Sequence, residues 1–271
     1  MKIGIFDSGY GGLTIYRKIK EHLPEYDYIY LGDNARTPYG NRSFDAILRF
    51  TTEGVRYLFS QDCRLIIIAC NTASAKALRS IQQKLLPIEF SDRRVLGVIR
   101  PSVEELGRDT HTKTVALWAT EGTVKSMSFA IEMEKHAPGV RLIQLECPML
   151  VPLVEAGELQ GPGTYYFLDK YWNQTARLSK DIDVLLLACT HYPLLLPGIR
   201  AIVPQQVRIL VQGDFVAPSL ADYLRRHSEI ECHLSRNGTQ QFLTTDRTEG
   251  FDHLAEIFLG HAVASEKIEL K

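Results

Sequence analysis

The sequence lacks several features that would assign it to a class of protein. Its 31 basic and 32 acidic residues leave a net charge of −1, so there is no basic excess to bind nucleic acid or an anionic membrane. The longest apolar runs, such as residues 65–69 and 184–188, are far shorter than the ~18 residues of a membrane span. The brief apolar stretch before Asp7 does not resemble a signal peptide. We therefore expect a cytoplasmic protein that binds neither nucleic acid nor a membrane.

Two kinds of cysteine site are also missing. The chain has five cysteines, an odd number, and no Cys-x-x-Cys pair, which argues against a disulfide framework and a four-cysteine zinc site. The simplest interpretation of scattered cysteines is small buried apolar residues in a reducing cytosol. With 271 residues, 45% of them apolar, the chain can form one large or two modest domains, and a disordered protein is excluded.

The glycine-rich loop at residues 7–13 does not match the common nucleotide-binding motifs. Thr14 occupies the third glycine position of the dinucleotide-binding fingerprint, and no P-loop lysine follows. Asp7 would end the preceding strand, where a carboxylate is a cap or a functional group. A second polar loop, residues 32–40, is either an ordinary connection or the rim of a substrate site.

What the sequence does contain is an alternation of short apolar runs with longer amphipathic segments. This predicts an α/β fold with mainly parallel sheets flanked by helices, in which ligands bind beyond the carboxyl ends of the strands. Strands are expected at residues 2–6, 28–31, 64–69, 95–99, 114–119, 140–145, 183–188 and 207–211. Helices are expected from residue 12 to about 22 and over 41–60, 73–86 (closed by Pro87), 123–135, 164–180 and 217–226.

One short pattern occurs twice. Residues 65–72 read LIIIACNT and residues 184–191 read VLLLACTH, so each apolar strand ends in Ala-Cys and a small polar residue. Coincidence is one explanation. The other is two similar lobes, each presenting a cysteine to a cleft between them.

Cys70 and Cys189 both precede predicted helices. A helix N-terminus lowers the pKa of a cysteine below its ordinary ~8.5, so both side chains are expected to become thiolates readily. Asn71 or Thr72 is a candidate N-cap, and Pro193 a candidate first helical residue. The remaining cysteines lack this context and are interpreted as structural: Cys63, Cys147 and Cys232.

His191 lies two residues after Cys189, and in an extended segment both side chains would point to one face. The imidazole would then assist proton transfer or favour the thiolate. A metal ligand and a core histidine are the alternatives. A lone Cys-x-His offers too few ligands for a metal ion, so no metal site is expected.

Two opposed thiols suit a stereoinversion at carbon. A thiolate removes a proton from one face while a thiol delivers a proton to the other, and the roles exchange in the reverse direction, with Asp7 and His191 adjusting the pair. A cysteine hydrolase would need an oxyanion hole but no second cysteine. A non-catalytic amino-acid-binding protein would need neither cysteine.

Four motifs together resemble the cofactor-independent glutamate racemases. They are Asp7-Ser8-Gly9-x-Gly11-Gly12, Pro38-Tyr39-Gly40, Ala69-Cys70-Asn71-Thr72-Ala73-Ser74 and Cys189-Thr190-His191, and the likeness runs from residue 3 to about 225. The resemblance implies interconversion of L- and D-glutamate without a cofactor, in the cytoplasm, supplying D-glutamate for peptidoglycan synthesis. It also implies a homodimer.

The resemblance implies a role for each matching residue. Cys70 and Cys189 would be the catalytic acid/base pair, Asp7 the carboxylate beside Cys70, and His191 and Glu155 the partners of Cys189. The substrate-binding positions would be Asp7, Ser8, Pro38, Tyr39, Gly40, Asn71, Thr72, Thr120, Thr123, Thr190 and His191.

The same resemblance implies a discontinuous first lobe, residues 1–99 plus 207–271, and a second lobe, residues 100–206. The chain departs from the family pattern at Arg100, where many members have Glu, and at Tyr10, where a smaller residue is common. The segment after about Glu231 matches weakly. An aspartate or hydantoin racemase remains an alternative from the same superfamily.

Overall fold

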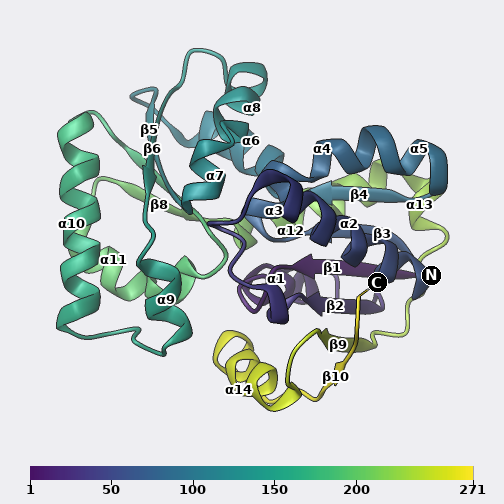
Figure 1. Ribbon diagram of the computed structural model, residues 1–271. Helices are drawn as coiled ribbons and strands as arrows, with labels where there is room; N and C mark the ends of the chain where they lie inside the picture. The colour runs from purple at the N-terminus through teal and green to yellow at the C-terminus, as the bar shows by residue number, and fades with distance from the viewer. Residues whose placement is uncertain (271) are drawn as a thin grey trace.

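The molecule contains two parallel β-sheets, each flanked by helices. The computed structural model describes residues 1–270. The first sheet has the order β10-β9-β2-β1-β3-β4 and the second the order β6-β5-β7-β8 (Figure 1). Every strand pair is parallel, which confirms the predicted α/β fold of two lobes.

The strands of the first sheet are β1 (Lys2–Asp7), β2 (Tyr28–Gly32), β3 (Cys63–Ile68), β4 (Arg94–Gly97), β9 (Gln240–Thr244) and β10 (Ser265–Lys267). Those of the second are β5 (Thr114–Ala119), β6 (Arg141–Glu146), β7 (Val184–Ala188) and β8 (Arg208–Val211). The helices are α1 (Leu13–His22), α2 (Phe44–Ser60), α3 (Asn71–Lys76), α4 (Leu78–Ser80), α5 (Leu86–Glu89), α6 (Ile99–Asp109), α7 (Glu121–Lys125), α8 (Ser128–His136), α9 (Leu150–Glu155), α10 (Pro162–Leu178), α11 (Leu196–Ile202), α12 (Gly213–Arg226), α13 (Ser228–Glu231) and α14 (Thr248–Leu259). Short 3₁₀ turns occur at η1 (Asn34–Arg36) and η3 (Tyr192–Leu195) and a π turn at η2 (Ile81–Leu85).

Apolar residues at helical spacing explain how the helices cover the sheets. In α2, Ile47, Val55 and Leu58 are fully buried, as expected for one apolar face of an amphipathic helix. The Ser43 hydroxyl caps this helix by accepting a hydrogen bond from the Ala46 N–H at 3.2 Å. Helix α2 therefore begins three residues later than the predicted residue 41.

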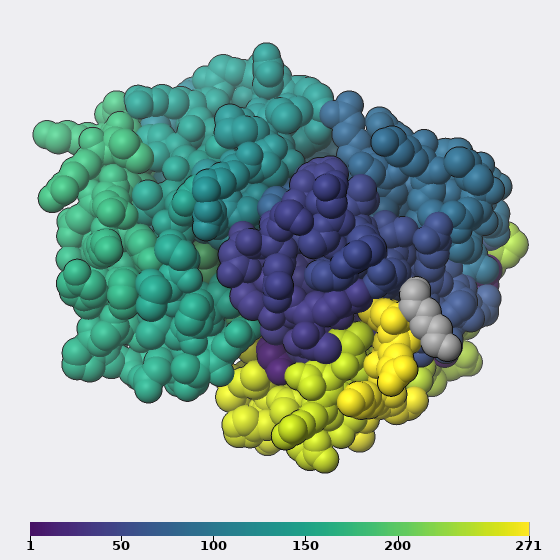
Figure 2. All heavy atoms as spheres, viewed as in Figure 1, coloured from purple at the N-terminus to yellow at the C-terminus, as the bar shows by residue number. Residues whose placement is uncertain are grey.

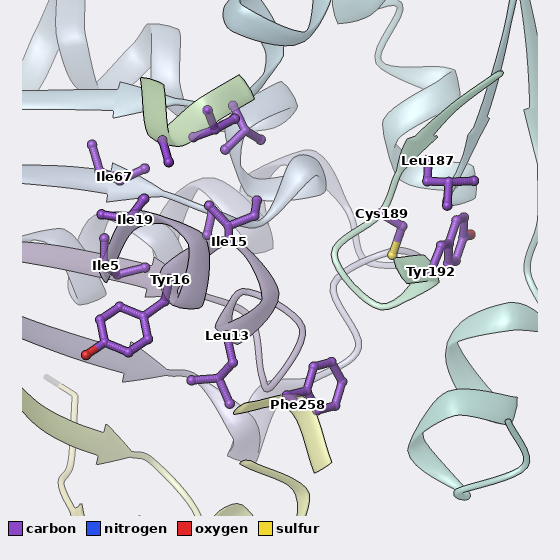
Figure 3. Close-up of a cluster of buried hydrophobic side chains, with 14 of the residues drawn as sticks. Ile5, Leu13, Ile15, Tyr16, Ile19, Ile67, Leu187, Cys189, Tyr192 and Phe258 are labelled. Carbon is purple, nitrogen blue, oxygen red and sulfur yellow. The ribbon is translucent and has the colours of Figure 1, made fainter. Parts of the chain in front are cut away.

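The largest core cluster joins the two lobes. It contains Ile5, Ile19 and Ile67 from the first lobe and Leu187 and Tyr192 from the second (Figure 3). The sheets are thus connected by continuous apolar packing as well as by the chain. In the second lobe, the fully buried Trp118 also donates a hydrogen bond from Nε1 to Thr175 Oγ1 at 2.8 Å.

Helix α12 begins four residues before the predicted residue 217, and three other predicted segments also differ from the structure. Pro87 does not close the helix predicted over 73–86, because the helical path passes through η2 and Pro87 lies in the first turn of α5, where no backbone N–H donor is needed. The helix predicted over 123–135 is broken at Met127, whose φ of 57° is left-handed. The strand predicted over 95–99 ends at Gly97, and Ile99 begins α6.

The boundary expected at residue 207 needs a correction. Strand β8 pairs with β7 in the four-stranded sheet, with Leu185 opposite Ile209, so the chain returns to the first lobe after Val211. The expected crossover near residue 99 coincides with the start of α6. With that change, the division into a discontinuous first lobe and a continuous second lobe stays a prediction. No helix within residues 1–270 combines the length and the apolar character that a membrane span requires.

Candidate active site

The first side of the site is built on β1 and β3, which are neighbours in the sheet. Asp7 ends β1 and is fully buried. Its Oδ2 accepts a hydrogen bond from the Gly9 N–H at 2.9 Å, while Oδ1 has no partner. A Cβ at Gly12 would lie 2.6 Å from the Asp7 Cβ, so only glycine fits there. Burial raises the pKa of Asp7 above its ordinary value.

Cys70 follows β3 and is itself the N-cap of α3, rather than Asn71 or Thr72 as predicted. Its Sγ accepts from the Ala73 N–H at 3.4 Å and lies 3.3 Å from the Ser8 Oγ. Burial, with the negative charge of Asp7, raises the pKa of Cys70 to about 12. The predicted lowering of this pKa is therefore wrong, because burial outweighs the N–H donor of a six-residue helix.

The second side is built on the turn after β7. The Cys189 Sγ lies 3.9 Å from the His191 Nδ1, and the His191 Nε2 lies 3.1 Å from the Glu155 Oε1 at the end of α9. The segment is a turn rather than the predicted extended stretch, since the Tyr192 N–H donates to the Cys189 carbonyl. Figure 3 shows the Cys189 sulfur projecting from this turn. Pro193 is the second residue of the 3₁₀ turn η3 that follows.

His191 is positioned on three sides. Burial lowers its pKa, but the bonds to Cys189 and Glu155 outweigh burial and raise the pKa to about 10. The ring also packs edge-on against Phe258 of α14, with centroids 5.7 Å apart. A Cβ at Gly11 would lie 2.5 Å from the His191 Nδ1, so the glycine loop after β1 touches this turn directly.

The two sides enclose one cavity of about 360 Å³. In the space-filling view, the purple segment around residue 40 lies over the boundary with the teal lobe (Figure 2). The cavity brings together most of the predicted site residues: Ser8, Pro38, Tyr39, Gly40, Cys70, Asn71, Thr72, Thr120, Glu155, Cys189, Thr190 and His191. A larger hollow of about 770 Å³ lies along β8 and contains none of these residues.

Asp7 and Thr123 do not line the cavity. Asp7 lies behind the glycine loop, and the Thr123 hydroxyl lies 3.3 Å from that of Thr72 and 3.1 Å from that of Thr120. Both are fully buried. They are therefore placed to support lining residues rather than to touch a ligand.

The cavity rim is fixed by buried hydrogen bonds. The Tyr39 hydroxyl donates to Asp33, which also accepts from the Arg36 Nε at 2.7 Å and from the Thr245 hydroxyl at 2.9 Å. Gly40 accepts from the Gly122 N–H of the second lobe at 2.8 Å. The loop at 37–41 is thus held by both lobes.

Thr37, in the loop expected as a candidate rim, also lines the cavity. Six further lining residues were not predicted from the sequence: Asn41, Glu121, Cys147, Pro148, Val151 and Pro152. Cys147, predicted to be structural, lies one residue after β6 and lines the same cavity. The rule that ligands bind beyond the carboxyl ends of parallel strands would have found it. Within residues 1–270, no group of three or more His, Cys, Asp or Glu side chains could hold a metal ion.

The chain is similar to known proteins over nearly its whole length. A family model described as Asp/Glu/Hydantoin racemase matches residues 3–213. The glutamate racemase of Persephonella marina is 37% identical over 100% of this chain and 98% of that protein, and that of Paracoccus denitrificans is 38% identical over 98% and 99%.

Solved structures of glutamate racemases superpose on this chain over nearly its whole length. A glutamate racemase isoform from Bacillus anthracis superposes with a TM-score of 0.90 at 30% identity, covering 99% of this chain and 97% of that one. The Francisella tularensis glutamate racemase in complex with D-glutamate gives 0.85 at 30% identity, covering 100% and 97%. An aspartate racemase from Picrophilus torridus, at 18% identity and 0.54, shares the fold.

The chain belongs to the Asp/Glu/hydantoin racemase family. It is an isomerase, as predicted. The proteins of Persephonella marina, Paracoccus denitrificans and Jannaschia sp., which match over 98–100% of their own length, are glutamate racemases, in agreement with the resemblance stated from the motifs.

Proposed function

We propose that the protein is a glutamate racemase that interconverts L- and D-glutamate by proton transfer at the α-carbon, without a cofactor. The observation that carries the proposal is the placement of Cys70 and Cys189. Each follows the carboxyl end of a strand in a different sheet, and both line one cavity between the lobes.

One thiol acts as the base and the other as the acid in each direction of the reaction. In one direction the Cys189 thiolate takes the α-proton, and the Cys70 thiol gives its proton to the opposite face of the carbanion. Protons balance: Cys189 becomes a thiol, Cys70 a thiolate, and the α-carbon is inverted. The reverse reaction starts from that second state.

The surroundings of the thiols fit this starting state. Protonated His191, 3.9 Å from the Cys189 Sγ, is a counter-charge for a thiolate, and Glu155 holds the imidazole from its other side. Cys70, with its raised pKa, keeps its proton until a carbanion needs it. Asp7 acts on Cys70 through its charge and from behind the cavity.

The cavity suits a small dicarboxylic amino acid. Its volume of about 360 Å³ falls in the usual range for small-molecule sites. Hydroxyl and amide donors surround it, among them Ser8, Asn71, Thr72, Thr120 and Thr190. These groups and nearby backbone N–H donors would hold the carboxylates and the amine.

The wider role rests on the glutamate racemase relatives. D-glutamate from this reaction would supply peptidoglycan synthesis in the cytoplasm, and the protein would work as a homodimer. An aspartate or hydantoin racemase and a non-catalytic amino-acid-binding protein are the rival functions.

One experiment decides among these functions. Circular dichroism over time is recorded for L-glutamate and L-aspartate with the purified protein, without added pyridoxal phosphate and with a chelator present. Loss of the glutamate signal, with incorporation of solvent deuterium at the α-carbon, supports the proposal. Turnover of aspartate alone overturns glutamate as the substrate, and a requirement for pyridoxal phosphate overturns the cofactor-free chemistry. No turnover of either amino acid overturns the proposal in favour of a hydantoin racemase or a binding protein, which the same assay with an L-hydantoin separates.

A further inference from the structure

A buried amide joins the two places where the chain crosses between the lobes. The first crossover lies between β4 and α6, at Val98, and the second between β8 and α12, at Gln212. The Gln212 side chain is 2% exposed. It therefore lies in the interior at the junction of the lobes, although glutamine is mostly a surface residue.

Gln212 forms a reciprocal amide pair with Asn71. The Asn71 Nδ2 donates to the Gln212 Oε1 at 2.6 Å, and the Gln212 Nε2 donates to the Asn71 Oδ1 at 3.1 Å. The second Nε2 hydrogen goes to the Ser102 Oγ at 2.7 Å. Both amide hydrogens and the amide oxygen of Gln212 thus form hydrogen bonds.

The orientation of this amide follows from its neighbours. The Ser102 hydroxyl donates its only hydrogen to the Val98 carbonyl at 2.6 Å. Its oxygen must then accept from Gln212, so the group facing it is the nitrogen. Hydrogen bonds thus link the Val98 carbonyl at the first crossover, through Ser102 and Gln212, to Asn71.

Asn71 comes directly after Cys70 and begins α3. A group that fixes Asn71 therefore also fixes the turn that carries the Cys70 sulfur. Because Gln212 lies at the second crossover and Ser102 follows the first, this turn is held relative to both connections between the lobes. A proton transfer between opposed thiols depends on such placement, since a shift of about 1 Å costs up to ~100-fold in rate.

We propose that Gln212 is a positioning residue for the racemisation: its amide fixes Asn71, and so Cys70, relative to the opposite lobe. The inference rests on the proposed racemase function. It assigns to Gln212 an effect on the proton-transfer step beyond its contribution to stability.

The test compares two substitutions at Gln212. Gln212→Met keeps the length but removes every hydrogen bond, and Gln212→Glu keeps the acceptor for Asn71 but places a carboxylate oxygen opposite the Asn71 Oδ1 and the Ser102 Oγ, which are both acceptors. We expect kcat to fall at least about tenfold in both variants, with KM changed by less than about threefold. The primary isotope effect with α-deuterated glutamate should rise in both variants.

One partial variant and one control separate positioning from stability. Ser102→Ala removes the link to the first crossover but leaves the pair with Asn71 in place, so kcat should fall less than in Gln212→Met. Gln206→Met changes an exposed glutamine just before β8 and should alter nothing. Folded fractions are measured by urea unfolding for every variant.

The outcomes are distinct. If Gln212→Met unfolds more readily but keeps the wild-type kcat and isotope effect per folded molecule, the residue is structural and the inference is overturned. A wild-type protein that racemises no amino acid would overturn the proposed function itself, and with it the role assigned to Gln212.

Discussion

The two Ala-Cys units differ more in structure than in sequence. Cys70 caps an α-helix and lies beside the Ser8 hydroxyl and the charge of Asp7. Cys189 lies in the turn before the 3₁₀ segment η3, beside an imidazole held by Glu155. One unit favours a thiol and the other provides a counter-charge for a thiolate. The proposed two-base reaction needs unlike surroundings for like groups, because its two thiols begin in opposite protonation states.

Removal of either sulfur should have the largest effect. We expect Cys70→Ala and Cys189→Ala each to lower kcat for racemisation by about 10³-fold or more, since each thiol is needed once in every turnover. Circular dichroism measures the loss. In D₂O, each variant should still exchange the α-proton of one enantiomer, and the two variants should differ in which one. Unchanged racemisation in either variant would contradict the two-base mechanism.

Replacement of the two carboxylates near the thiols, Asp7 and Glu155, should lower kcat to an intermediate degree. We expect Asp7→Asn to lower kcat by about 100-fold and Glu155→Gln by about tenfold, because Asp7 is buried beside Cys70 whereas Glu155 acts through His191. Initial rates in both directions provide the measurement. Equal losses in the two variants would contradict the asymmetry of the site.

Stability should report the protonation of His191. Its pKa is raised from the ordinary value of 6.5 to about 10, so the folded state binds this proton more tightly than the unfolded state. The resulting stabilisation is full below about pH 6.5 and is lost as the pH rises toward 10, by at most ~1.4 kcal/mol per pH unit. Urea unfolding of wild type and His191→Gln at pH 7 and 9 measures it. A variant with the same loss of stability as wild type over this interval would contradict the assignment.

Replacement of Cys147, the third cysteine that lines the cavity, should have the smallest effect on kcat. Cys147 lines the same space, but its Sγ bonds only to the Leu145 carbonyl at 3.8 Å. Burial raises its pKa well above the ordinary value. We expect Cys147→Ala to change kcat by less than about threefold, which makes it the matched control for the other two cysteine variants. A loss as large as theirs would mean that the wrong pair has been assigned.

The strands that carry the two Ala-Cys units, and several of their neighbours, could be predicted from the sequence. Strand β5 was predicted to the residue, and the repeated Ala-Cys pattern located both sulfurs, because short buried strands in parallel sheets are continuous apolar runs. Strand β9 of the six-stranded sheet was not predicted, because the run Gln240–Thr244 begins with polar residues. Helix α14 was missed with it.

Other features depend on contacts that sequence spacing does not reveal. The pKa of Cys70 is set by burial against Asp7, 63 positions away in the sequence, and overrides the local effect of the helix. The pairing of Asn71 with Gln212 spans 141 residues. Phe258 reaches His191 from the C-terminal segment, where the family pattern was weakest. Local sequence thus indicates the groups proposed to react, and tertiary packing determines their surroundings.

The buried indole of Trp118 has a spectroscopic consequence. The chain has two tryptophans, Trp118 on β5 and Trp172 on α10, and both belong to the half of the molecule built on the four-stranded sheet. Tryptophan emission therefore reports on one lobe, whereas a circular-dichroism signal averages over both. If the lobes melt separately, fluorescence and dichroism will give two different transitions from a single unlabelled sample.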